Sequence, residues 1–297
     1  MSEIGCNVPK SKLIPSGSRS INSSGNYLTV LERADATKSL YRVLLDSGIT
    51  QIMGSKEIRN GKWKDNMSPT LYGIGFIGDG VHMSKVGGTN TSTYDVWRGI
   101  MRRCYDVNLK SHYPTYGGAG ITVAEDWHNF QNFAEWYQVE CLKLPDIKLN
   151  IDKDLKGGKI YSPDNCVLLP YKLNNFITNS KTDGGLVGYT KPRSTKYTIT
   201  LSILGKQHYI GEFPNQEEGD YIYRVLREWT YTRLGYMYHA RGMISDEVLN
   251  LLSNQYSNYD DNQIQCVVEG YSSFIEKVNL FLSNEDVLTC RVKKLPK

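Results

Sequence analysis

Apolar and polar residues alternate in short runs near the start of the chain, and this pattern predicts β-strands. Residues 27–31 and 40–45 read YLTVL and LYRVLL, and residues 71–77 alternate apolar residues with glycines. We therefore expect a small β-rich module over residues 26–91. The preceding residues 1–25 are rich in Ser, Gly and Asn and predict a flexible arm.

From residue 92 the apolar positions take the period of an α-helix. Ser92 or Thr93 is placed to cap it, and apolar residues then recur at i, i+3, i+4 and i+7 from Trp97 to Cys104. A second helix is expected after Asn129, with aromatic residues at helical spacing. We expect the aromatic side chains of both helices to form a core rather than a ligand platform.

Residues 184–235 predict three short strands followed by a helix. In the middle strand, Ile199, Leu201 and Ile203 alternate with polar residues, so one face is apolar and the other polar and basic. Asn215 and Glu218 have the spacing of a capping box at the start of the helix. That helix is expected to cover the apolar face. The exposed ribbon has a shape that fits a DNA major groove, with an ordinary soluble sheet face as the alternative.

Charge is distributed unevenly along the 297 residues. Residues 243–290 carry eight acidic residues against the single base Lys277, whereas the rest of the chain is basic and the net charge is +4. A basic body predicts a polyanionic partner. The acidic segment shows helical apolar spacing, and we expect a helical hairpin used for packing, self-association or binding of another protein.

Composition narrows the class of protein further. No apolar run approaches the roughly 20 residues that a membrane-spanning helix needs, and the first residues lack the apolar core of a secretory signal. The six cysteines form no CxxC pair, so neither a zinc site nor a disulfide framework is indicated. We expect free thiols in a protein of the reducing cytoplasm.

Residues 149–175 read LNIDKDLKGGKIYSPDNCVLLPYKLNN and carry the candidate chemistry. A strand ends at Asp152, a glycine-containing loop leads to a second strand near Asn165, and a helix then presents Asn174. This order resembles the HNH, or His-Me finger, nucleases found in bacteriophage homing endonucleases. Upstream segments such as YPTYGGAGITV are similar to phage proteins of that group, so the resemblance spans about residues 70–180. From the residues alone, an ordinary hairpin with Asp, Gly and Asn in its turns is the alternative.

The resemblance implies a role for each matching residue. Asp152 and Asn174 would hold one Mg²⁺ or Mn²⁺, with Asn175 as a substitute for Asn174, and Asn165 would orient the general base. Lys153 stands where the family has the histidine that deprotonates water. A lysine acts as a base only where burial or nearby positive charge lowers its pKa; otherwise its ammonium can hold a phosphate, and Asp154 is the remaining candidate base.

Residues 184–235 are similar to the APETALA2-type DNA-binding domain, which often follows the nuclease module in phage homing endonucleases. The resemblance rests on the Gly-Lys turn, on Tyr209-x-Gly211-x-Phe213 and on Glu217-Glu218, whereas Gly219 and larger residues replace the usual helix alanines. It implies that DNA contacts come from this sheet, and the arginines of the first helix add to them. The predicted DNA-binding residues are Arg98, Arg102, Lys191, Arg193, Lys196, Thr198, Thr200 and Lys206.

The sequence thus predicts an α+β, multi-module protein with a ββα-metal finger. The expected segments are an arm (1–25), a β-rich module (26–91), the finger domain (92–180), a sheet-plus-helix module (181–242) and an acidic helical module with a basic tail (243–297). The first hypothesis is a phage-encoded, metal-dependent DNA endonuclease in the bacterial cytoplasm. In it, Lys153 would replace the histidine that serves as general base in the family. The alternatives are an inactive DNA-binding protein and an accessory protein whose acidic helices bind a protein.

Overall fold

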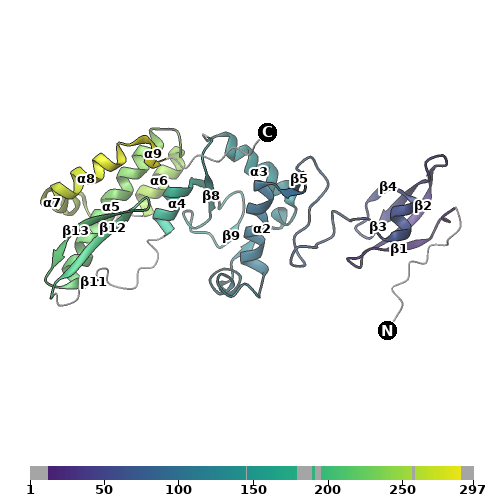
Figure 1. The fold of residues 1–297 in the computed structure, drawn as a ribbon, viewed down its shortest axis with the longest axis horizontal. Helices are drawn as coiled ribbons and strands as arrows, with labels where there is room; N and C mark the ends of the chain where they lie inside the picture. The colour runs from purple at the N-terminus through teal and green to yellow at the C-terminus, as the bar shows by residue number, and fades with distance from the viewer. Residues whose placement is uncertain (1–12, 145, 179–188, 191–194, 256–257, 289–297) are drawn as a thin grey trace. The chain divides into compact units, whose positions relative to one another are not determined.

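The computed structural model describes residues 13–144, 146–178, 189–190, 195–255 and 258–288 (Figure 1). The chain divides into two compact units, residues 1–137 and 138–297, with the boundary inside helix α3 (Phe130–Leu142). Strands and helices occur in both units, which confirms the predicted α+β class. In the part of the chain that is described, no helix has the length and apolarity to cross a membrane.

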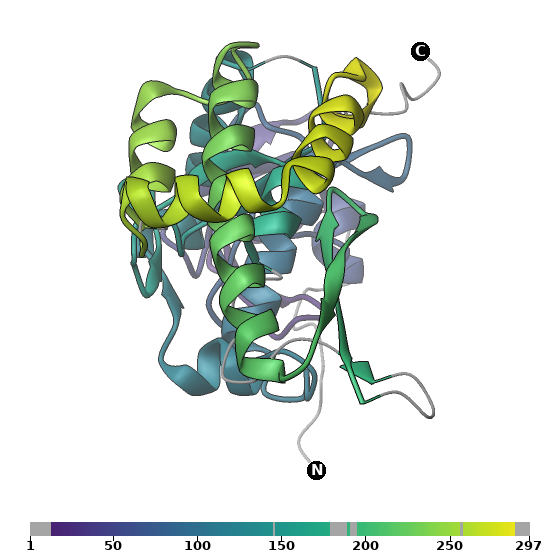
Figure 2. The ribbon, with the colours of Figure 1, turned by 90° about the vertical axis from the view of Figure 1, so that its left-hand side faces the viewer.

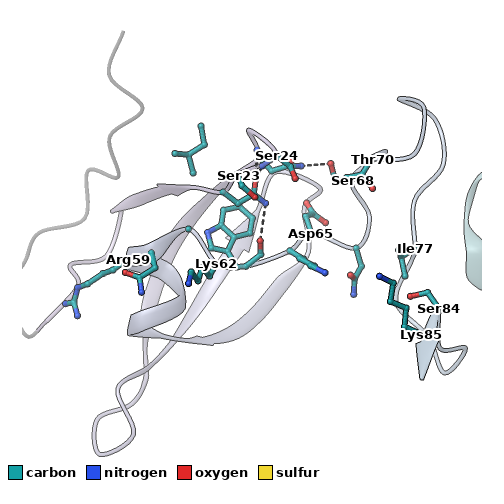
Figure 3. A pocket seen from close by; sticks show the side chains of 18 of the residues that line it. Ser23, Ser24, Arg59, Lys62, Asp65, Ser68, Thr70, Ile77, Ser84 and Lys85 are labelled. Atoms are coloured by element: carbon teal, nitrogen blue, oxygen red, sulfur yellow. Dashed lines mark hydrogen bonds between the residues drawn. The ribbon is translucent and has the colours of Figure 1, made fainter. Parts of the chain in front are cut away.

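An antiparallel four-stranded sheet begins the first unit. Its strands β1 (Arg19–Ile21), β2 (Tyr27–Asp35), β3 (Leu40–Leu45) and β4 (Thr50–Gly54) pair in chain order, and helix α1 (Ser55–Asn60) follows. Alternate residues of β3 are buried, as its pattern predicts. The expectation of a flexible arm is wrong for residues 13–25, because β1 pairs with β2 and Ile14 is buried in the core. A hollow of about 910 Å³ opens beside this sheet (Figure 3).

Residues 71–77 form a turn and not the predicted strand. Tyr72 and Gly73 both have a positive φ, at 55° and 71°, and the Gly75 N–H donates to the Leu71 carbonyl. Two consecutive left-handed residues reverse the chain, which ends any strand at this point. A short hairpin of β5 (Lys85–Val86) and β6 (Thr89–Asn90) follows, turned by two glycines with positive φ.

Two helices and their aromatic core complete the first unit. Helix α2 (Ser92–Tyr105) buries the predicted stripe from Trp97 to Cys104, and its cap is Thr91, one residue before the predicted position. Between α2 and α3 lie η1 (Tyr113–Thr115), η2 (Gly117–Ala119), β7 (Thr122–Val123) and η3 (Glu125–His128). The ring centres of Trp97 and Phe130 are 5.5 Å apart, so the aromatic stripes form a core as predicted.

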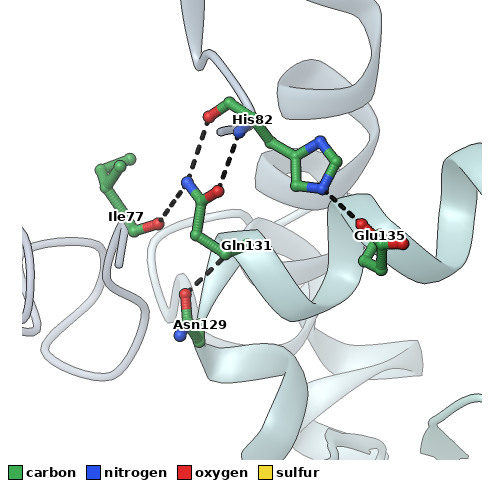
Figure 4. Close-up of polar contacts among 5 residues, drawn as sticks. All are labelled: Ile77, His82, Asn129, Gln131 and Glu135. Carbon is green, nitrogen blue, oxygen red and sulfur yellow. Dashed lines mark hydrogen bonds and ion pairs between the residues drawn. The ribbon is translucent and has the colours of Figure 1, made fainter. Parts of the chain in front are cut away.

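A polar clamp holds residues 77–82 on the start of α3 (Figure 4). The buried amide of Gln131 accepts from the His82 N–H at 2.9 Å and donates to the carbonyls of Ile77 and His82. The His82 ring lies 2.8 Å from Glu135. Buried polar groups that are fully paired fix backbone geometry, so this loop has a defined position against the helix.

The second unit contains the candidate site and a second sheet. Strands β8 (Leu149–Asp152), β9 (Ile160–Tyr161) and β10 (Val167–Pro170) precede helix α4 (Tyr171–Thr178). Strands β11 (Tyr189–Thr190), β12 (Tyr197–Ile203) and β13 (Lys206–Phe213) form an antiparallel sheet, and helix α5 (Gln216–His239) follows. The Asn215 side chain accepts from the Glu218 N–H, which confirms the predicted start of this helix.

Helices α6 (Asp246–Gln255), α7 (Asp261–Gly270), α8 (Ser272–Leu282) and α9 (Glu285–Leu288) confirm that the acidic segment is helical. Figure 2 shows them gathered around the long helix α5, and α8 also packs on β13. The buried carboxylate of Glu228 accepts from the N–H groups of Asn258 and Tyr259. The acidic segment therefore packs against the rest of the second unit, which is the first of the three uses predicted for it.

Candidate functional site

Strands β8 and β10 and helix α4 form a compact hairpin-plus-helix at residues 149–178. The strands are antiparallel, with Asp152 opposite Val167 and Leu149 opposite Pro170. Helix α4 begins directly after Pro170 and packs against both strands. Leu169 and Leu173 are fully buried in the core of the second unit, so apolar residues of the hairpin and of the helix fix their contact. The predicted order of strand, loop, strand and helix is present.

Asp152 and Lys153 lie side by side at the end of β8, and both are buried. Asp152 Oδ1 accepts the N–H of Leu155 at 2.8 Å, which fixes the first turn of the loop. Lys153 Nζ donates to Asp154 Oδ1 at 2.7 Å and lies 5.7 Å from the centre of the Tyr161 ring. An ammonium beside a carboxylate is a proton donor and carries no acceptor lone pair. In this arrangement Lys153 is buried and donates its hydrogen bond to Asp154.

Asn165 holds the loop between the two strands. Its Nδ2 donates to the carbonyl of Ile160 at 3.2 Å, and its N–H donates to Ser162 Oγ. A Cβ built on Gly158 would lie 2.9 Å from Asn165 Cγ, so glycine is required for this close approach. The amide therefore positions the loop that follows Lys153, and its role toward a general base stays a prediction.

Asn174 presents a polar atom that lacks a protein partner. Its Oδ1 is buried, and no described residue donates a hydrogen bond to it. An amide oxygen left in this state costs free energy of about 1–3 kcal/mol, and a bound cation would offset that cost. Asn175, the predicted substitute, is half-buried. The structure thus singles out Asn174 over Asn175 as a candidate ligand.

The oxygen donors of this site suit magnesium better than zinc. Mg²⁺ is commonly held by one or two carboxylates together with substrate phosphates and water, and Asp152 and Asn174 supply one carboxylate and one amide oxygen. Across the described ranges, no group of three or more His, Cys, Asp and Glu side chains is placed to hold a metal ion. Burial raises the pKa of the nearby Cys166 thiol to about 12, so this sulfur is neutral and is a poor metal ligand at neutral pH.

The predicted DNA-binding residues are exposed to different degrees. Arg98 and Arg102 are about half exposed and form ion pairs within α2, with Asp95 at 3.1 Å and with Asp106 at 3.4 Å. Lys196 is exposed and Thr200 is half-buried. Lys191 and Arg193 lie outside the described residues. These positions leave the DNA contacts of α2 and β12 as predictions.

One of the predicted contacts on the second sheet is wrong. Thr198 is only 2% exposed, and its neighbour Ile199 is also buried, so both faces of β12 are covered at this point. Lys206 is exposed at the turn between β12 and β13, with its Nζ 4.8 Å from the centre of the Phe281 ring, and it stays a predicted contact. The open polar face instead presents Ser202, Gln207 and Tyr209.

The sequence analysis missed His208, which is buried between β13 and α8. Its ring centre lies 4.9 Å from that of Phe281, and its Nε2 is buried with no hydrogen-bond partner among the described residues. Burial, and then the charge of Lys206, lower the pKa of His208. The apolar spacing of α8 was visible in the sequence, but no signal showed that its apolar face would cover a histidine.

Acidification is expected to weaken the packing of α8 through His208. The folded pKa lies below the ordinary value of about 6.5, so the unfolded chain binds the proton first as pH falls. The free energy of unfolding should therefore be constant above about pH 7 and should decline below about 6.5. Urea titrations between pH 5 and 8 measure this decline. His208→Gln should flatten the profile, whereas the exposed His112→Gln should not; equal profiles for wild type and His208→Gln would contradict the assignment.

Comparison of the chain with protein-family models, with curated proteins and with solved structures finds no significant match.

Proposed function

We propose that this chain is a DNA-binding endonuclease of the HNH type that hydrolyses phosphodiester bonds with one divalent metal ion. The observation that carries the proposal is the hairpin-plus-helix of residues 149–178, with buried Asp152 at the end of β8. On α4, the amide oxygen of Asn174 has no hydrogen-bond partner among the described residues. The same residues carry the resemblance to phage nucleases of this type. The proposed setting is accordingly a phage-encoded protein acting in the bacterial cytoplasm.

Each residue of the hairpin has a proposed role. Asp152 and Asn174 would hold Mg²⁺ or Mn²⁺, and the ion would supply Lewis-acid stabilisation of the leaving 3′ oxygen. Lys153, whose side chain is 4% exposed and paired with Asp154, would hold a phosphate as a point charge after it releases that carboxylate. Asn165 keeps the loop in place. Asp154, about 44% exposed, is the carboxylate available to take a proton from water once Lys153 engages phosphate.

Sequence-independent affinity for DNA is the second part of the proposal. The candidate contacts on the described residues are the half-exposed arginines Arg98 and Arg102 and the exposed lysines Lys196 and Lys206. Arginine and lysine neutralise backbone phosphates, so binding should weaken as salt rises. Lys191 and Arg193 remain proposed contacts of the same kind.

One observation favours a second candidate function, an inactive DNA-binding protein built on the same finger. Lys153 is buried and paired with Asp154, so neither residue is a ready proton acceptor. A general base contributes about 10²–10⁴-fold to a rate of this kind. A protein with this pair intact would hold DNA and cut it slowly or not at all.

A supercoiled-plasmid assay separates the two functions. With about 5 mM Mg²⁺ or Mn²⁺, we expect slow conversion of supercoiled to nicked circles, because the metal ligands are present and the usual base is absent. Excess EDTA should stop the conversion. Retarded migration of the plasmid without nicking in either metal would support the inactive DNA-binding protein, and neither binding nor nicking would reject both functions.

A further inference from the structure

A hollow lined by several cations lies beside the N-terminal sheet, within the first unit (Figure 3). Its volume is about 910 Å³, and its walls come from the ends of β1 and α1, from residues 60–70 and from the segment that carries Ser84 and Lys85. The charged residues that line it are four cations and one acid: Arg59, Lys62, Lys64, Lys85 and Asp65. The lining of the hollow therefore carries a net positive charge. It lies in the N-terminal module, outside the candidate site of residues 149–178.

Hydrogen bonds to β1 and to the residue that follows it hold the loop that carries Lys62 and Lys64. Exposed and buried residues alternate along it, so that Trp63 and Asp65 point into the module while the two lysines face solvent. The Trp63 indole N–H donates to Ser20 Oγ at 3.3 Å, and Asn22 Nδ2 donates to the Trp63 carbonyl at 3.3 Å. The two ammonium groups are thus carried by a backbone of fixed position.

Two further features fix the same loop. Gly61 ends α1 in the left-handed region, with φ 59°, and a Cβ there would lie 2.5 Å from the Ile21 carbonyl oxygen. Only glycine fits this junction. Asp65 Oδ1 accepts from Ser47 Oγ at 2.9 Å and from the Met67 N–H at 3.0 Å. Asp65, the one acidic residue of the lining, therefore accepts hydrogen bonds that hold the loop in place. It is only 6% exposed.

Neutral hydrogen-bond donors complete the wall. Ser23, Ser24 and Asn60 line the hollow together with the cations. Within the described part of the chain, no side chain forms an ion pair with Lys62 or Lys64. Lysine ammonium groups together with hydroxyl and amide donors are the groups that contact phosphate oxygens of nucleic acids without reading the bases.

We propose that this hollow binds the phosphate backbone of DNA, as a contact separate from the hairpin of residues 149–178. The inference rests on the proposed DNA-binding function and adds to it a site on the N-terminal module. The lining offers cations and small polar groups, and its two aromatic residues are the buried Trp63 and the half-buried Tyr94. The site therefore contributes affinity and orientation and not sequence selection.

The test is duplex binding by a variant that lacks the two anchored lysines. Lys62→Ser/Lys64→Ser is compared with wild type and with Lys38→Ser/Lys56→Ser, which removes the same charge from exposed positions of the same module that do not line the hollow. The probe is a fluorescein-labelled DNA duplex of arbitrary sequence, bound in EDTA and followed by anisotropy between about 50 and 200 mM salt. Each phosphate contact contributes about 0.9 to the slope of log affinity against log salt.

The site variant should bind more weakly than the control variant, and its salt slope should be smaller than that of wild type by about 1.8 for two lost contacts. The ratio of wild-type to site-variant affinity should then fall about tenfold between 50 and 200 mM salt. Equal affinity and slope for the site and control variants would overturn the site while leaving DNA binding intact. Absence of salt-dependent binding by wild type would overturn the proposed function as well. Far-ultraviolet circular dichroism of each variant confirms that the fold is retained.

Discussion

Asp152→Asn is expected to abolish metal-dependent nicking, with a loss of at least about 100-fold, while the fold is retained. The asparagine Oδ1 can still accept the Leu155 N–H that Asp152 Oδ1 accepts at 2.8 Å, so the turn after β8 is preserved. The substitution removes the negative charge that a hard divalent ion requires. The measurement is the rate of plasmid nicking as a function of Mg²⁺ concentration, and any residual activity should need more Mg²⁺ than wild type.

A matched control for this variant lies in the same loop. Asp164 is exposed, and it is its backbone carbonyl, not its carboxylate, that accepts from Lys156. Asp164→Asn removes the same charge from the hairpin and should nick at the wild-type rate. If Asp152→Asn and Asp164→Asn both retained wild-type nicking, Asp152 would not be a metal ligand. If both lost it, the effect would be one of overall charge and not of coordination.

The elements predicted from the sequence are those whose own residues determine them. The stripe from Trp97 to Cys104 and the alternation in β3 are local patterns, and both are buried as predicted. Strand β1 was missed because its three residues have no pattern of their own and are held by hydrogen bonds from β2. Residues 71–77 were misassigned because the alternation did not reveal the left-handed backbone at Tyr72 and Gly73.

In the candidate site, too, local sequence patterns predicted the order of the elements but not the surroundings of every side chain. The order of Asp152, Asn165 and Asn174 was readable from the sequence, because it follows from strand, loop and helix. The burial of Thr198 was not. Thr198 and Ile199 are neighbours on β12 and both are buried, so each face of the strand is covered at this point. Alternation within one strand does not show that its polar face is also covered.

Lys153→His is expected to raise the nicking rate by about 100-fold or more, because it restores a group that can accept a proton. Lys153 donates to Asp154 at 2.7 Å and is buried, whereas a neutral imidazole offers one acceptor nitrogen and titrates near neutral pH. General-base catalysis contributes about 10²–10⁴-fold. The plasmid assay across about pH 6–9 measures the gain, which should appear as pH rises through the imidazole pKa.

Two companion variants decide what the lysine does in the native protein. Lys153→Gln removes the cation without adding a base, so it should nick no faster than wild type; if it nicks more slowly, the ammonium contributes as a phosphate contact. Asp152→Asn/Lys153→His should be inactive, because a restored base does not replace the carboxylate that holds the metal. Activity in that double variant would place the metal elsewhere. A Lys153→His protein as slow as Lys153→Gln would mean that the base position is not at residue 153, and the hairpin would then be a binding element whose chemistry has been lost at more than one residue.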